Sequence, residues 1–164
     1  MKLKLWSCFL VLLLLVGCSS SSVPNEKEVM EITLAYNKAR FELNQKDFSV
    51  KDKQELFPEI NERMKQYSTE KVYQEFVRIR GAGYAIEAAK LGKAIQVKEI
   101  TISKLEEVEK SLNVDYNMIV QINSSENNET SEHKVLGQLT LIKENDSWKI
   151  DRVWDSFTFK ELGL

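Results

Sequence analysis

Histidine, cysteine, proline and glycine are all scarce in this chain of 164 residues, which contains one, two, two and six of them respectively. The single histidine, His133, leaves little material for acid–base or zinc chemistry, because both usually depend on imidazole. Both cysteines, Cys8 and Cys18, lie within the first 18 residues, so a cysteine nucleophile or a thiolate metal site further along is excluded. No stretch concentrates lysine and arginine between aromatic residues, which argues against a nucleic-acid surface.

Long apolar runs are also missing, apart from one near the start that extends from Leu5 to Gly17. This run has 13 residues, whereas a helix needs about 20 to span a bilayer. A basic start, residues 1–4, precedes the run, and four serines, residues 19–22, follow Cys18. A charged start, an apolar centre and a junction of small residues are the three parts of a secretory signal, so the pattern predicts an exported protein.

The junction Leu15, Val16, Gly17 and Cys18 resembles the lipobox of bacterial lipoproteins. The resemblance implies that the Cys18 thiol receives a diacylglyceryl group and that cleavage makes Cys18 the amino terminus. Two acyl chains hold a protein stably at a bilayer, since each buried methylene contributes about 0.8 kcal/mol. The expected location is therefore the extracytoplasmic side of the cell membrane, with either the inner or the outer membrane as the host. A plain signal peptide that is cleaved without lipid is the alternative.

The predicted organisation has three parts. Residues 1–17 form the signal peptide, residues 18–25 the lipidated cysteine and a flexible tether, and residues 26–164 a single domain. Without the first 17 of its 164 residues the chain keeps 21 basic and 25 acidic residues, a net charge near −4. The seven residues from Ser19 to Asn25 reach at most about 25 Å, so the domain is expected to work close to the membrane.

Helical periodicity occupies the first half of the domain. From residue 26 to about residue 46 apolar side chains recur at three- and four-residue spacing, and Asn25 is placed to cap this helix. A second pattern, residues 56–67, contains Pro58, which either opens that helix or kinks it. A third pattern begins near residues 68–69 and directs Ile79, among others, inward. A glycine-containing break at residues 81–83 separates it from a short helical piece, residues 84–91.

After Gly92 the period changes from 3.6 to 2, which indicates strands. Four are predicted, at residues 94–104, 112–123, 133–143 and 148–159. The second alternates strictly between apolar and polar residues, so one face of the sheet is expected to be buried and the other solvated. Helices followed by an antiparallel meander predict an α+β domain in which amino-terminal helices cover a curved four-stranded sheet.

The order of these elements resembles the nuclear-transport-factor-two-like superfamily, also called the cystatin-like cone. The resemblance depends on a long first helix, a break at Lys46-Asp47-Phe48, more helix, and a sheet that closes on residues 146–151, Asp-Ser-Trp-Lys-Ile-Asp. It covers residues 26–164. It implies a sheet wrapped around the first helix and an open-ended pocket, which some members use for catalysis through an Asp and a His.

Candidate site residues are few. His133 is flanked by Glu132 and Lys134 and is interpreted as a surface histidine, so no catalytic residue is assigned. By strand parity Arg152 and Trp154 share one side with Trp148 and Ile150. If that side faces the cone, Arg152 can receive a carboxylate or phosphate. Tyr116, Arg152 and Trp154 are the predicted ligand contacts, against the alternative that the aromatic residues are core and Arg152 pairs with an acid.

No metal or cofactor is expected, because the sequence offers no second histidine and no acidic loop with calcium spacing. The leading functional hypothesis is a non-catalytic binding module in the cell envelope with a protein partner. One alternative is a small-molecule binder or an isomerase- or dehydratase-like enzyme that uses the cone pocket. Another is a lipoprotein of the immunity or exclusion kind. The oligomeric state stays open.

Overall fold

The computed structural model describes residues 23–163. The predicted signal peptide, the lipobox with Cys18 and most of the tether lie outside these residues. The elements follow in the order α1 (Glu26–Phe41), η1 (Gln45–Ser49), η2 (Lys53–Leu56), α2 (Phe57–Lys65), α3 (Glu70–Arg78), α4 (Gly83–Lys90), β1 (Lys93–Val108), β2 (Ser111–Ser124), β3 (Thr130–Glu144), β4 (Ser147–Asp155) and η3 (Phe159–Leu162). Within residues 23–163 no helix is both long and apolar enough to cross a membrane.

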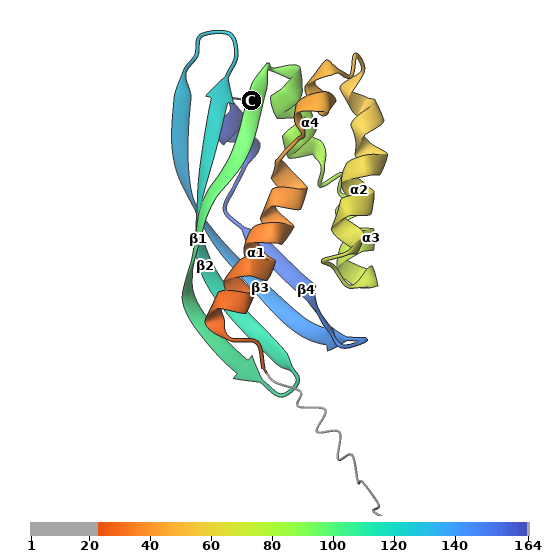
Figure 1. Cartoon of the computed structure of the whole chain (residues 1–164), viewed down its shortest axis with the longest axis vertical. Helices are drawn as coiled ribbons and strands as arrows, with labels where there is room; N and C mark the ends of the chain where they lie inside the picture. Colours follow the sequence, from red (N-terminus) through yellow and green to blue (C-terminus); the bar gives the residue numbers. More distant parts are fainter. Residues whose placement is uncertain (1–22, 164) are drawn as a thin grey trace, which may run out of the picture.

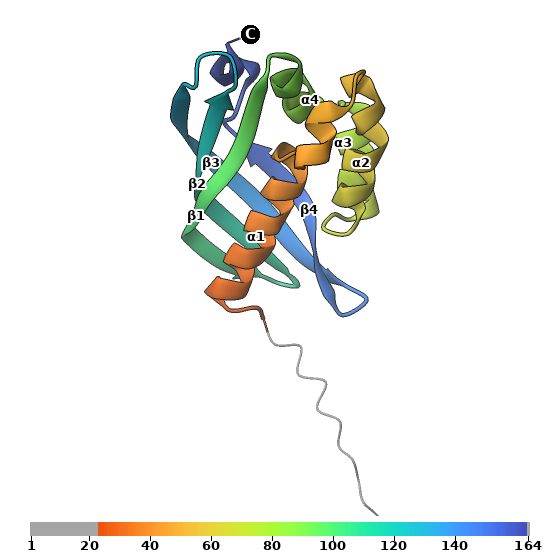
Figure 2. The same cartoon turned by 45° about the horizontal axis from the view of Figure 1, so that its top comes forward.

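The four strands form one antiparallel sheet in the order β1-β2-β3-β4. Two register shifts in β1, at Val97/Glu99 and Ile102/Lys104, bend the sheet. Asn145 and Asp146 join β3 to β4 with φ angles of 48° and 63°, the positive values that a type I′ hairpin turn requires. All four helices lie on one face of the sheet (Figures 1 and 2). The predicted α+β class, with helices packed on a curved four-stranded sheet, is confirmed.

Helix α1 crosses the sheet and packs mainly against β1. Asn25 caps it as predicted, through a reciprocal pair of hydrogen bonds with Glu28. Its buried face includes two polar residues, Thr33 and Asn37, that apolar periodicity does not detect. Both bond to their own helix: Thr33 Oγ1 donates to the Val29 carbonyl at 2.8 Å and Asn37 Nδ2 to the Thr33 carbonyl at 2.9 Å. The donors of both side chains are therefore satisfied inside the helix, whereas the buried Asn37 Oδ1 has no hydrogen-bond partner among the described residues.

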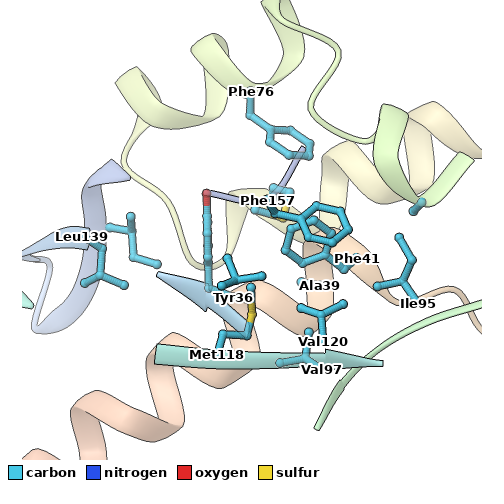
Figure 3. Packing of buried hydrophobic residues seen from close by; sticks show 14 of the residues in the cluster. Tyr36, Ala39, Phe41, Phe76, Ile95, Val97, Met118, Val120, Leu139 and Phe157 are labelled. Carbon is cyan, nitrogen blue, oxygen red and sulfur yellow. The ribbon is translucent and has the colours of Figure 1, made fainter. Parts of the chain in front are cut away.

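The core lies between α1 and the inner face of the sheet (Figure 3). Alternate residues of β2 are buried as predicted, from Leu112 to Ile122, whereas their neighbours face outward. The largest side chains that are almost fully buried include Tyr36, Phe41 and Tyr116. On the outer face polar side chains pair across strands: Thr140 donates to Asn113 at 2.9 Å and Gln138 donates to Asp115 at 3.0 Å. One face is thus dry and the other solvated.

Several element boundaries differ from the sequence prediction. Helix α1 ends at Phe41 rather than near residue 46, because Asn44 caps a separate 3-10 turn that begins at residue 45. Strand β4 ends at Asp155 rather than residue 159, and the chain continues into η3. Ile79, predicted to point inward, is 58% exposed because α3 ends at Arg78 and the chain turns away. Of the two roles considered for Pro58, it opens α2, in the first turn.

Gly137 gives the sheet a testable packing constraint. A Cβ atom at this position would lie 2.1 Å from Tyr116 Cζ, inside the ring's van der Waals surface. We expect Gly137→Ala to lower the free energy of unfolding by about 1–3 kcal/mol, as overpacking does in closed cores. Gly83→Ala is the matched control, since its Cβ meets Phe159 at an ordinary 3.7 Å. Equal stability of both variants in urea denaturation would contradict this packing.

Candidate functional site: a groove between helix α3 and strand β4

A groove of about 590 Å³ runs between α3 and the edge strand β4. We call it the α3–β4 groove. Its helix wall consists of side chains that recur every three or four positions on one face of α3 and its C-cap: Lys71, Val72, Glu75, Phe76 and Ile79. Its strand wall is residues 151–155, and its floor includes Tyr36, Arg40, Tyr84 and Phe157. Figure 3 shows Phe76 and the Tyr36 hydroxyl on the side of the core toward α3.

The segment before α3 attaches this helix to the sheet. The Ile150 N–H donates to the Tyr67 carbonyl at 2.8 Å, and the Thr69 N–H donates to the Ile150 carbonyl at 2.9 Å. The Thr69 hydroxyl then accepts from the Val72 N–H, as an N-cap does, and donates to Asp151 Oδ1 at 3.1 Å. Lys71 Nζ lies 2.8 Å from Asp151 Oδ2. These contacts start α3 beside β4 and leave the rest of the helix separated from the strand by the groove.

Asp151 is the extra residue of a β-bulge. Leu141 pairs with Ile150 and Thr140 with Arg152, so Asp151 has no partner on β3. The bulge reverses the alternation, because Ile150 faces the core, whereas Arg152 and Trp154 point outward. The predicted parity, with Ile150, Arg152 and Trp154 on one side, is therefore wrong. The Asp151 side chain accepts hydrogen bonds from Thr69 and Lys71, and these bonds stabilise the bulge.

The floor of the groove carries an ion pair that sequence reasoning did not find. Arg40, in the last turn of α1, donates through Nη1 to Asp155 Oδ2 at the end of β4. Their side chains are 12% and 3% exposed. The second carboxylate oxygen of Asp155 accepts from the Phe157 N–H at 3.0 Å. The Arg40 guanidinium also lies 4.4 Å from the centre of the Phe41 ring, a cation–π distance.

The Asp155 carboxylate keeps the Arg40 guanidinium protonated. Burial alone lowers the pKa of the Arg40 guanidinium, but the neighbouring carboxylate and its hydrogen bond outweigh burial, so the pKa is raised. The arginine is therefore a fixed cation, and its partner neutralises it. Because arginine does not titrate in the working range of proteins, this pair holds structure and presents hydrogen-bond donors rather than moving protons.

Two buried phenols stand beside the pair. Burial raises the pKa of Tyr36 to about 12, with Arg40 opposing and Asp155 adding to the shift. Burial also raises the pKa of Tyr116, and Asp155 acts in the same direction. Both hydroxyls therefore keep their protons at neutral pH. A general base needs a group that titrates near the working pH, and neither phenol is one.

Because these phenols are buried, the free energy of unfolding depends on pH in the alkaline range. The unfolded chain ionises a tyrosine near pH 10, whereas the folded chain keeps the Tyr36 proton until about 12. Between these values the unfolded state releases a proton that the folded state retains, so the free energy of unfolding falls as pH rises, by about 2–3 kcal/mol. We expect Tyr36→Phe to reduce this loss in urea titrations from pH 9 to 12. An equal loss in both proteins would contradict the buried state of Tyr36.

The rim of the groove includes several exposed apolar side chains. Ile79 is 58% exposed, Trp154 54% and Phe159 41%. The Phe159 ring stacks on Tyr84 at 4.4 Å between centroids, and Tyr84 in turn packs edge-on against Phe41 and Phe157. Large apolar side chains that gather at the edge of a groove are typical of a surface that binds a partner.

The structure brings together two of the three predicted ligand contacts, Arg152 and Trp154, and places Tyr116 apart from them. Tyr116 lies in the core, 1% exposed, with Asn37 Nδ2 3.5 Å from its hydroxyl, and does not line the groove. Arg152 and Trp154 line the rim of the groove and also a smaller depression of about 260 Å³ on the outer face of the sheet. His133 lies half-buried on β3 with Nε2 3.0 Å from Ser131 Oγ, away from the groove. Ligand binding by Tyr116, Arg152 and Trp154 stays a prediction.

Among residues 23–163 no three His, Cys, Asp or Glu side chains gather closely enough to hold a metal ion. A second hollow of about 610 Å³ lies at the other end of the sheet and is lined by Val23, the β1–β2 turn and Trp148. This is the end from which residues 23–25 lead toward the amino terminus (Figure 1).

The chain matches no family model and no curated protein. Solved structures share its fold. An IcmL-like type IV secretion system protein from Legionella pneumophila aligns with TM-score 0.59 and 6% identity over 82% of this chain and 94% of that chain. The periplasmic domain of DotI aligns with TM-score 0.57 and 10% identity over 83% and 98%. An Ntf2-like protein involved in plasmid conjugation aligns with TM-score 0.49 and 12% identity over 81% and 49%. At these identities the likeness concerns the fold alone.

Proposed function

We propose that this protein is a lipid-anchored, extracytoplasmic binding module of the bacterial cell envelope, without catalytic activity, and that it holds a protein partner in the α3–β4 groove. The observation that carries the proposal is the groove itself. It combines a rim of exposed apolar side chains with a floor whose ionisable groups are paired or protonated.

The sequence before the domain supports the proposed location at the membrane. Leu15-Val16-Gly17-Cys18 resembles a lipobox, and a diacylated Cys18 would hold the chain at the bilayer without any apolar protein surface. The domain begins at Glu26, only eight positions after Cys18. Two of the proteins with a similar fold are described as a periplasmic domain and a type IV secretion system protein. An extracytoplasmic domain for protein assembly is consistent with both.

The chemistry of the groove supports binding rather than catalysis. Arg40 and Asp155 neutralise each other, and Tyr36 keeps its proton to about pH 12. Nucleophilic catalysis needs a side chain beside a base that can activate it, and the described residues that line the groove include no Cys, Ser or His. Lys71, the lining residue with a titratable amine, is paired with Asp151.

A small-molecule ligand is the second candidate. The volume of about 590 Å³ lies within the range of about 300–1,000 Å³ that is usual for such sites. Arg152 and Trp154, two of the predicted ligand contacts, lie on the groove's rim. This candidate predicts that a metabolite, rather than a protein, raises the melting temperature of the purified chain.

The proposal is tested by affinity capture from solubilised envelopes with the full-length chain as bait. Ile79→Glu places a charge on the rim, and Leu136→Glu is the matched control, because Leu136 is similarly exposed (53% against 58%) but points outward from β3. We expect the wild type and the Leu136 variant to capture the same envelope protein, and we expect its recovery to fall at least tenfold with the Ile79 variant. Equal recovery by all three baits would overturn binding in the groove.

A further inference from the structure

We propose that the partner enters the α3–β4 groove as an extended segment and pairs with the free edge of β4 as a fifth strand of the sheet. This inference rests on the proposed function, because it says how the envelope partner is held. The occupant is an apolar segment of another protein that carries at least one acidic residue.

The chain itself already pairs with this edge at one point. Residues 67–69 form a parallel bridge to β4 at Ser68 and Ile150, with hydrogen bonds of 2.8 Å and 2.9 Å on either side. After Thr69 the chain turns into α3 and leaves the edge. No further backbone hydrogen bond from the described residues reaches this edge between Arg152 and Asp155. The pairing that residues 67–69 begin is therefore left unfinished along the groove.

The register tells which backbone groups are free. In an antiparallel ladder, hydrogen-bonded and non-bonded pairs alternate. The Ser156 N–H donates to the Leu136 carbonyl at 2.9 Å, so the pairs of Trp154 and Arg152 with β3 are the bonded ones. Val153 and Asp155 consequently direct their N–H and C=O groups toward the groove. An edge with unpaired groups of this kind is a ready template for another strand.

The walls select the side chains of such a strand. Alternate side chains of an extended segment point to opposite faces. One set would meet Val72, Phe76 and Ile79 of the helix wall, which favours aliphatic or aromatic residues. The other set would lie beside the exposed Trp154 ring, at the solvent side of the groove.

The charges around the groove favour an acidic residue. Lys71 pairs with Asp151, Arg40 with Asp155, and Arg78 with Glu75. Among the described residues no carboxylate pairs with the two remaining cations, Arg80 and Arg152, although the Arg80 guanidinium donates to Gln54 Oε1 at 2.8 Å. Both line the groove. The excess is positive, so a segment with a carboxylate complements it better than a basic one.

The test uses a library of random 12-residue peptides displayed on phage, with the full-length chain purified in detergent as bait. We expect enriched peptides with apolar residues at alternate positions and an acidic residue. Their affinity should fall at least tenfold for the Ile79→Glu chain and stay unchanged for Leu136→Glu. The proposal would be overturned if the wild-type bait enriched no peptides relative to the Ile79→Glu bait. It would also be overturned if circular dichroism showed that the bound peptides are helical.

Backbone methylation then separates strand pairing from side-chain docking. An enriched peptide is synthesised with N-methyl groups at its odd positions and, separately, at its even positions. A fifth strand directs only every second N–H toward β4, so one set should abolish binding and the other should leave most of it. Equal effects of both sets would overturn the pairing, and self-association of the bait through β4 would point to a second copy as occupant instead.

The two proposals fail in different ways. If N-methylation at alternate peptide positions abolishes binding but no envelope protein is captured, strand addition is supported and the proposed envelope function is contradicted. If an envelope protein is captured through Ile79, but its segment tolerates methylation at every position, the function stands and the fifth strand falls.

Discussion

An Asp155→Asn variant is expected to have a free energy of unfolding about 3 kcal/mol lower than that of the wild type, because the substitution leaves the Arg40 cation without its counter-charge in a nearly closed site. Asp155 is 3% exposed and Arg40 12%, so water cannot fully replace the lost carboxylate. The loss should show as a lower urea midpoint with an unchanged slope. It should also loosen the aromatic cluster on which Arg40 lies, which near-UV circular dichroism would detect.

Two comparisons make this result specific. Glu106→Gln breaks the exposed pair with Lys104 and should leave the urea midpoint unchanged. The double variant Arg40→Met, Asp155→Leu removes both charges and should recover most of the stability, since the main cost of the single change is an uncompensated charge. If Asp155→Asn were as harmless as Glu106→Gln, the pair would not hold the groove floor.

If Cys18 is the lipid anchor, replacing it with Ala is expected to move nearly all of the protein from the membrane fraction to the soluble fraction of the cells that express it. Two acyl chains contribute about 0.8 kcal/mol per buried methylene, and the proposal provides no other anchor. Radioactive palmitate should label the wild type and not the variant. Cys8→Ala is the matched control, because Cys8 lies in the segment that cleavage would remove. An unlabelled wild type, or a Cys18 variant that still sediments with membranes, would contradict the lipid anchor.

Periodicity predicted most of the fold. The helix from Glu26, its cap at Asn25, the break at residues 81–83 and the four strands are all present. Local patterns suffice here because one buried face imposes a period of 3.6 on a helix and of 2 on a strand. The lengths of β1 and β3 were underestimated, since their outer ends are solvated on both faces and carry no alternation.

The candidate site was largely beyond such reasoning. The bulge at Asp151 reverses the parity of Arg152 and Trp154, and it is stabilised by Thr69 and Lys71, which lie about eighty positions earlier. Arg40 and Asp155 are likewise 115 positions apart, so no local pattern joins them. One signal was present: Tyr36 and Arg40 are four positions apart, one turn of the same helix face. An arginine in line with a buried aromatic residue indicates a charge directed toward the core.

The most direct test of the binding claim is photo-crosslinking in living cells that carry the full-length chain. A benzophenone side chain at position 79 lies on the rim of the α3–β4 groove, and the same probe at position 136 lies on the outer face of the sheet. We predict one envelope protein that crosslinks from position 79 and not from position 136. Crosslinks from position 136 alone, or none from position 79 above the unirradiated background, would contradict the groove as the site of partner binding.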